Sequence, residues 1–151
     1  MVWGAFSHDY RTPLYFFDQP VNANTYQQVL QNHVVPLFGQ HPELQLFQHD
    51  NARPHTARAT TAFLQTNNID VLPWPSLSPD MAPIEHVWDE LGRRLSRGRP
   101  LHNLQELRRS LTNEWVQIPQ VFFQTLVNSM RRRCQSCIQA NGGHTRYYCK
   151  C

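Results

Sequence analysis

Two acidic residues, Asp50 and Glu85, stand where carboxylates could share a metal ion. Asp50 ends the run LQLFQHD, whose apolar residues predict a buried strand. Glu85 lies in the first turn of a predicted helix, and 34 residues separate the two. Magnesium and manganese prefer such hard oxygen ligands to thiolates. Two of these ions about 3.5–4 Å apart can stabilise the attacking and leaving oxygens of a phosphodiester together. The pair therefore indicates phosphoryl-transfer chemistry.

Each of these carboxylates also has a purely structural interpretation. Asp50 could accept a hydrogen bond at the end of its strand and cap the next turn through Asn51. Glu85 could simply stabilise its helix, because a negative charge interacts favourably with the positive end of the helix dipole. Considered one residue at a time, without a wider pattern, the structural roles are the more common ones.

The N-terminal half must supply the strand that carries Asp50. Short β-prone segments predict a hairpin from strands 2–6 and 14–17. Asn24 is the expected N-cap of an amphipathic helix over 25–35, with Pro36 in the loop that follows it. Strand 44–49 is expected to be buried on both faces. A short helix opened by Pro54 and a strand over 69–72 complete this half.

The C-terminal half must supply the helix that carries Glu85. Asp80 is the expected cap of this helix, and Gly98 and Pro100 end it. Asn103 with Glu106 forms a capping box for the next helix, and Pro119 begins a last long one. The order of elements predicts a single α/β domain over 1–151, with a mixed sheet flanked by helices and a helical C-terminal layer.

The segments HDNARPH and SPDMAPIEHVWDELGRRL, with the 34-residue spacing, closely resemble the catalytic domain of Tc1/mariner-type DDE transposases. The resemblance extends from MVWGAF to SMRRRCQSCIQANGGHTRYY. It implies a ribonuclease-H-like fold in which Asp50 and Glu85 are catalytic metal ligands. It also implies a third carboxylate on a strand before MVWG, so we expect this chain to lack the first strand and its Asp, and to be a partial domain without the N-terminal DNA-binding domain.

The resemblance implies DNA transposition and integration by Mg²⁺- or Mn²⁺-dependent phosphoryl transfer. A two-metal site is expected only in the intact enzyme, so we expect the isolated chain to be inactive. The alternative is a non-catalytic nucleic-acid-binding remnant, or a partner of a full-length transposase. DNA, and a second copy or a full-length transposase, are the expected partners. The resemblance also implies action in the nucleus.

The candidate DNA-binding residues are polar or basic side chains near the two carboxylates. Asn51 and His55 could position DNA or a metal-bound water, or could be part of a hydrogen-bonded turn. Arginines at 93, 94 and 97 follow the Glu85 turn and suit phosphate, since a guanidinium can form paired hydrogen bonds. A charge run on a helix can equally be a solvated face. Asp89, four residues after Glu85 on the same helix face, could support the metal ligands, but a solvated ion pair with Arg93 is the more common arrangement.

Composition excludes several classes of protein. The 151 residues are 40% hydrophobic and 17% charged with net charge +3, which describes a globular chain. No apolar run is long enough for a membrane span, and nothing indicates a small-molecule cofactor. The remaining alternative is a zinc site, with thiolates at positions 134, 137, 149 and 151. A CxC pair is poor spacing for zinc, and Cys134 and Cys137 fall inside an apparent helix, so a zinc site is the least favoured hypothesis.

Overall fold

The computed structural model describes residues 1–76 and 78–143. Within this part, the contacts between residues divide the chain into two compact units. The first unit contains Met1 and residues 17–76, and the second contains residues 2–16 and 78–143. Asp50 therefore belongs to the first unit and Glu85 to the second. The single domain over 1–151 stays a prediction.

The first unit contains a pair of parallel strands, β3 (Leu46–Phe47) and β4 (Asp70–Val71). Leu46 is paired with Asp70, and the ladder continues as the Leu72 N–H donates to the Phe47 carbonyl at 2.9 Å. Phe47 is buried, but Leu46 is 56% exposed. The expectation of burial on both faces is wrong for this strand, because successive side chains point to opposite faces and only one face is covered.

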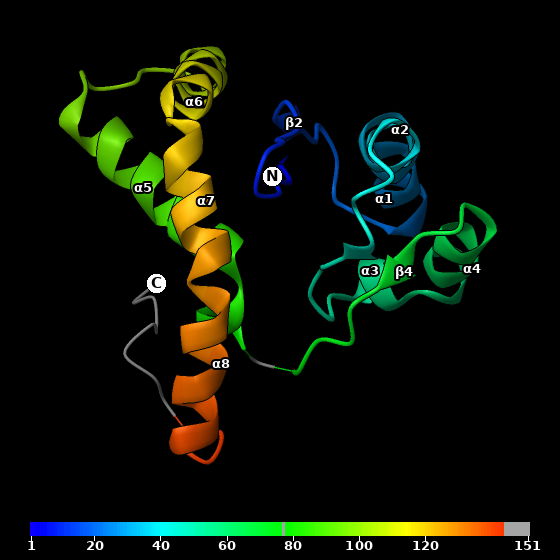
Figure 1. Cartoon of the computed structure of the whole chain (residues 1–151). Coiled ribbons are helices and arrows are strands. Elements are labelled where there is room, and N and C mark those ends of the chain that lie inside the picture. Colours follow the sequence, from blue (N-terminus) through cyan, green and yellow to red (C-terminus); the bar gives the residue numbers. More distant parts are fainter. Residues whose placement is uncertain (77, 144–151) are drawn as a thin grey trace. The chain divides into compact units, whose positions relative to one another are not determined.

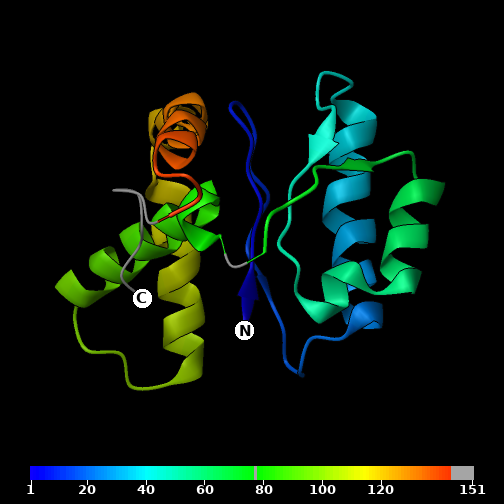
Figure 2. The ribbon, with the colours of Figure 1, turned by 90° about the horizontal axis from the view of Figure 1, so that it is seen from below.

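Three helical segments between residues 23 and 40 follow one another as a continuous rod (Figure 2). They are α1 (Ala23–Val29), a π-helical turn η1 (Leu30–Val34) and α2 (Val35–Gln40). The helix thus continues through Pro36, where the sequence predicted a loop. A proline ring clashes with the carbonyl four residues earlier in a regular α-helix, and the wider turn directly before Pro36 relieves that clash.

The N-cap of α1 is Asn22 and not the expected Asn24. The Asn22 side chain accepts a hydrogen bond from the Thr25 N–H at 3.0 Å, and the Thr25 hydroxyl lies 2.9 Å from the Asn22 N–H. This reciprocal pair is a capping box with threonine in the place usually held by glutamate or glutamine. Such a box starts the helix two residues earlier than the sequence indicated.

The segment after Asp50 forms two short helices, α3 (Arg53–Thr56) and α4 (Arg58–Thr66). Ala57 separates them with an extended backbone, φ −57° and ψ 138°. Thr60 is fully buried in α4, and its hydroxyl donates to the Pro54 carbonyl at 2.7 Å. This bond fixes α3, and therefore the turn that follows Asp50, against α4.

The second unit begins with the predicted hairpin, which is antiparallel. It pairs β1 (Val2–Trp3) with β2 (Tyr15–Phe16). The turn of the hairpin is bound to the end of a helix, since the Arg11 guanidinium donates to the carbonyls of Trp115, Val116 and Ile118 at 3.0, 2.9 and 2.6 Å. Unpaired carbonyls at a helix C-terminus favour such a cation.

The rest of the second unit is helical (Figure 1). Its elements are a 3₁₀ turn η2 (Pro79–Met81), α5 (Pro83–Arg97), α6 (Leu104–Gln117), α7 (Gln120–Asn128) and α8 (Met130–Gln139). The predicted last long helix is divided at Ser129, whose hydroxyl donates to the Leu126 carbonyl at 2.6 Å. A side chain that bonds back to its own helix in this way disturbs the regular helical ladder.

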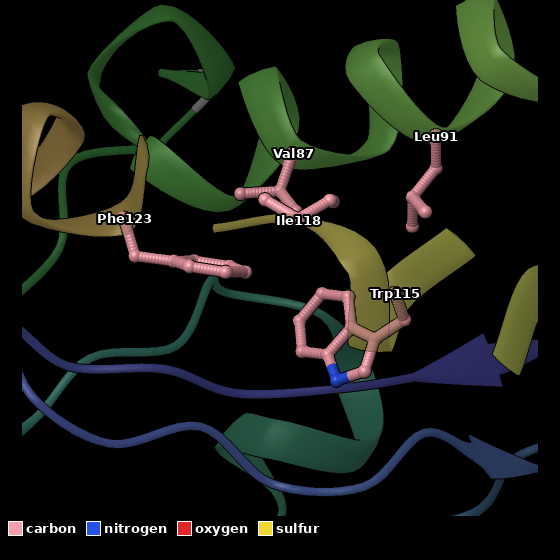
Figure 3. Packing of buried hydrophobic residues seen from close by; sticks show 5 residues of the cluster. All are labelled: Val87, Leu91, Trp115, Ile118 and Phe123. Carbon is pink, nitrogen blue, oxygen red and sulfur yellow. The ribbon is translucent and has the colours of Figure 1, made fainter. Parts of the chain in front are cut away.

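The core of the second unit forms where α5 meets α6 and α7. Val87 and Leu91 point from α5 toward the indole of Trp115, and Ile118 and Phe123 complete the cluster (Figure 3). All five are at most 2% exposed. The Trp115 indole N–H donates to the Thr12 carbonyl at 2.8 Å, which joins the hairpin to this core. The Glu85 helix is therefore held by apolar packing along its length.

No helix of the described chain combines the length and the apolar character that a membrane crossing requires.

Candidate active site

Asp50 lies in the loop three residues after β3, and one of its two carboxylate oxygens is held by two donors. Oδ1 accepts a hydrogen bond from the Ala52 N–H at 3.0 Å and lies 2.6 Å from Nδ1 of His55. Oδ2 has no hydrogen-bond partner among the described residues. The Asp50 side chain is 65% exposed. It therefore presents one free oxygen to solvent, which is what a metal ion approaching from solvent requires.

The His55 ring forms a cluster with two other rings of the first unit. It stacks on His49 with an interplanar angle of 3° and a centroid distance of 5.0 Å, and it lies 4.1 Å from the ring of Tyr26. Tyr26 is 1% exposed, and its hydroxyl lies 3.0 Å from Nδ1 of His49. Burial, followed by the neighbouring His55, lowers the pKa of His49 to about 4, although the Asp50 carboxylate opposes the shift. His49 is therefore neutral near pH 7.

Asn51 also has an intramolecular partner. Its side-chain amide donates to the Trp74 carbonyl at 2.9 Å, which joins the Asp50 loop to the segment after β4. Asn51 and His55 thus both take part in hydrogen bonds that shape the loop, as the structural alternative supposes. Their contact with DNA stays a prediction.

Glu85 lies half-buried in the first turn of α5, which Pro83 begins. The N-cap is Ala82, which offers no side-chain hydrogen bond, so the prediction that Asp80 caps this helix is wrong. Asp80 belongs to the 3₁₀ turn η2 directly before the helix. The tight turn places two residues, Met81 and Ala82, between Asp80 and the first residue of α5.

A buried arginine, Arg133, supports the segment that leads into α5. Arg133 is 2% exposed; its guanidinium donates to the Asp80 carbonyl at 3.0 Å and to the Ser129 hydroxyl at 2.9 Å. Burial, followed by the charge of Arg133, lowers the pKa of His86, while Asp89 opposes the shift. Its neighbours in the sequence, Arg131 and Arg132, are both exposed, so the run of three arginines does not by itself reveal the separate role of Arg133. Helical spacing could have indicated the burial of Arg133, because it lies three residues after the apolar Met130 and therefore on the same face of the helix.

The arginines at the end of α5 differ in how their charge is used. Arg93 and Arg94 both pair with Glu90, at 2.6 and 2.7 Å, and Arg94 also approaches Glu114 at 3.5 Å. The hydrogen bond from Arg94 is the main cause that lowers the pKa of Glu90. Arg93 thus pairs with Glu90 and not with the expected Asp89. Arg97 is exposed and has no ion pair within the described chain, so its charge is available for a phosphate.

The oxygen ligands present suit a hard divalent cation, because Asp50 offers an exposed carboxylate oxygen with no hydrogen bond within the described chain. Within residues 1–76 and 78–143, no group of three or more His, Cys, Asp or Glu side chains could hold a metal ion. Since Asp50 and Glu85 belong to different units, their meeting at one ion stays a prediction. Cys134 and Cys137 are free thiols in α8, whereas Cys149 and Cys151, required for the zinc alternative, lie outside the described residues.

Comparison with known proteins places these features in a family. A model of the DDE superfamily endonuclease domain matches residues 1–108. The transposase of the transposable element Tc1 from Caenorhabditis elegans is 36% identical over 148 residues, which cover 97% of this chain and 54% of the relative. The chain therefore spans about half the length of that curated relative.

Two solved structures show the same fold. One is the Mos1 transposase catalytic domain with Raltegravir and Mg, with a TM-score of 0.83, 27% identity, and coverage of 96% of this chain and 76% of that one. The other is the Mos1 transposase paired-end complex with the left transposon end, with a TM-score of 0.80, 26% identity, and coverage of 95% and 44%. The ribonuclease-H-like α/β fold expected from the sequence is confirmed. The chain belongs to the DDE superfamily endonuclease family, within its Tc1/mariner transposase branch.

Proposed function

We propose that this chain is part of the catalytic domain of a DNA transposase, which cuts and joins DNA strands by metal-dependent phosphoryl transfer. The family match and the identity to the Tc1 transposase support this proposal. The observation that carries it is the Asp50 carboxylate, which stands 65% exposed just after a parallel strand with one oxygen held and one free.

In this proposal Asp50 and Glu85 hold Mg²⁺ or Mn²⁺, as the Mos1 structure with Mg suggests. When bound, such an ion would stabilise the charge that develops on the phosphodiester oxygens. The chain contributes the placement of the two carboxylates: Asp50 through hydrogen bonds in its loop, and Glu85 through the packing of α5. Arg97 would bind the DNA backbone without sequence preference.

The test uses a fusion protein, in which this chain is joined to the region of the Tc1 transposase that has no counterpart in it. Nicking of supercoiled DNA by this joined protein is measured with Mg²⁺ or Mn²⁺. We expect the 151-residue chain alone not to nick, and the joined protein to nick. Asp50→Asn and Glu85→Gln should each abolish nicking, whereas Asp89→Asn, an exposed acid on α5, should not. Nicking that survives Asp50→Asn would contradict the proposal. So would an inert joined protein when the Tc1 transposase itself nicks in the same assay.

A second candidate function is a non-catalytic nucleic-acid-binding remnant or a partner of a full-length transposase. It is favoured by exposed arginines that have no ion pair within the described chain, among them Arg97, Arg131 and Arg132. This function predicts DNA binding, seen as a gel shift, that weakens steeply as the salt concentration rises. The double variant Arg131→Ala/Arg132→Ala should bind DNA more weakly, and Asp50 should bind no metal ion. Either function would place the chain in the nucleus with chromosomal DNA, which microscopy of a fluorescent fusion would check.

A further inference from the structure

We propose that His55 is a positioning residue that holds Oδ1 of Asp50, so that Asp50 presents Oδ2 alone to a metal ion. This inference rests on the proposed function, because it assigns a role around the same carboxylate. It differs from the role in DNA contact that the sequence suggested for His55.

The contact itself fixes the direction of the hydrogen bond. An ionised carboxylate only accepts, so Nδ1 of His55, 2.6 Å from Oδ1, carries the proton. The Ala52 N–H donates to the same oxygen at 3.0 Å. Two donors on one oxygen leave the carboxylate a single preferred orientation, with the second oxygen facing outward.

The surroundings of His55 hold its ring in place for this bond. The side chain is 19% exposed, and its ring contacts both the Tyr26 ring and the His49 ring, which also lie close to each other with centroids 6.0 Å apart. Its backbone N–H donates to the Ala52 carbonyl at 2.8 Å, so the same residue that binds Oδ1 also fixes the start of the turn. Tyr26, which is buried in α1, thus reaches the Asp50 carboxylate through one intermediate ring.

This arrangement favours positioning over DNA contact. The ring nitrogen Nδ1 is already engaged by Asp50, and four-fifths of the side chain is covered. A carboxylate without this donor could rotate, and a metal ion would then have to order it on binding. Partners that orient a metal ligand typically change metal affinity by roughly 10–100-fold.

Two variants separate the donor from the ring. His55→Phe keeps an aromatic ring beside Tyr26 and His49 but has no donor. His55→Asn keeps an amide donor near the place of Nδ1 but has no ring. Mn²⁺ is titrated into each protein while the paramagnetic broadening of amide signals around Asp50 is followed by NMR, and the melting temperature is measured alongside.

We expect His55→Phe to raise the Mn²⁺ concentration for half-broadening by about 10-fold or more, and His55→Asn to restore most of the affinity. The melting temperatures should follow the opposite order, with His55→Asn the lower, because it loses the stacking. Unchanged Mn²⁺ binding in His55→Phe, or Mn²⁺ binding that merely follows the melting temperature, would overturn the inference.

Asp50→Asn distinguishes failure of this inference from failure of the proposed function. If Asp50→Asn loses Mn²⁺ binding while His55→Phe binds like the wild type, only the positioning role fails. If the wild type shows no broadening near Asp50, both fail. A metal-free check uses the imidazole ¹⁵N signals: His55 should be the Nδ1–H tautomer in the wild type, and a wild-type ring protonated at Nε2 alone would also overturn the inference.

Discussion

The two candidate carboxylates are held by different kinds of structure. Asp50 lies in a loop of the first unit and is oriented by hydrogen bonds from Ala52 and His55. Glu85 lies in the first turn of a 15-residue helix whose inner face packs on the aromatic core of the second unit. One carboxylate therefore depends on a few directional bonds between neighbours in the sequence, and the other on apolar burial between distant segments.

This difference predicts which substitutions affect each carboxylate. Hydrogen bonds contribute about 0.5–1.5 kcal/mol each to stability, so loss of one near Asp50 would alter orientation more than folding. Removal of a buried aromatic side chain costs about 3–5 kcal/mol. We therefore expect Glu85 to be displaced only when the second unit as a whole unfolds. The expected effects below run from the largest to the smallest.

Trp115→Ala should cause the largest loss, about 3–5 kcal/mol in the free energy of unfolding, because the indole is 2% exposed within the core of the second unit. Denaturant unfolding measures the loss, and hydrogen exchange should show faster exchange of the α5 amides. Val116→Ala is the matched control: its side chain is 62% exposed, and it should change stability by less than about 0.5 kcal/mol. A small effect of Trp115→Ala would refute the claim that packing holds α5.

Arg133→Met keeps an unbranched side chain but removes the donors to the Asp80 carbonyl and the Ser129 hydroxyl. We expect a loss of about 1–3 kcal/mol, because the partly buried Asp80 carbonyl and the buried Ser129 hydroxyl both lose their donor. Exchange of the amides at the start of α5 should increase. The exposed neighbour gives the control, Arg132→Met, which should be nearly neutral. Equal effects of the two substitutions would show that Arg133 has no special role.

Asn22→Ala should cost about 1 kcal/mol, as expected for the loss of an N-cap. Asn24→Ala should be neutral or slightly stabilising, since Asn24 is exposed inside α1 and alanine has the higher helix propensity. Thermal unfolding of the two variants checks the assignment. The reverse order would restore Asn24 as the cap.

Glu90→Gln should have the smallest effect, below about 1 kcal/mol, because the two arginines that pair with Glu90 are 60% and 27% exposed and solvent screens their charge. The hydrogen bond from Arg94 lowers the pKa of Glu90 below its ordinary 4.5. The stabilisation is therefore present above pH 4.5 and is lost as the pH falls through the lower folded value. The difference in melting temperature between wild type and Glu90→Gln should vanish in acid and shrink in high salt; a difference that persists at pH 2 would contradict this account.

The sequence predicted those features that depend on local patterns. Apolar spacing predicted the helix that begins at Pro83 and carries Glu85, and the turn-like segment between two short β-prone runs predicted the antiparallel hairpin. The family pattern predicted the ribonuclease-H-like fold. These successes rest on signals contained within one segment, or on a long motif.

The sequence did not predict features that depend on contacts between segments. The exposure of Leu46 depends on which face of β3 is covered, and the burial of Arg133 depends on what packs against α8. The enclosure of His55 by Tyr26 joins residues 29 positions apart, and no periodicity indicates it. The helical path through Pro36 needs a π-turn, which propensity rules do not foresee.

The central claim is that Asp50 and Glu85 hold one metal ion, and a Mn²⁺ titration of wild type, Asp50→Asn, Glu85→Gln and the double variant tests it most directly. Paramagnetic broadening of amide signals should appear near both residues in the wild type and weaken near both in each single variant. The double variant should bind no more weakly than the singles, because either substitution already disables a shared site. Glu85→Gln that binds Mn²⁺ like the wild type, or broadening near Asp50 that never extends to Glu85, would contradict the claim.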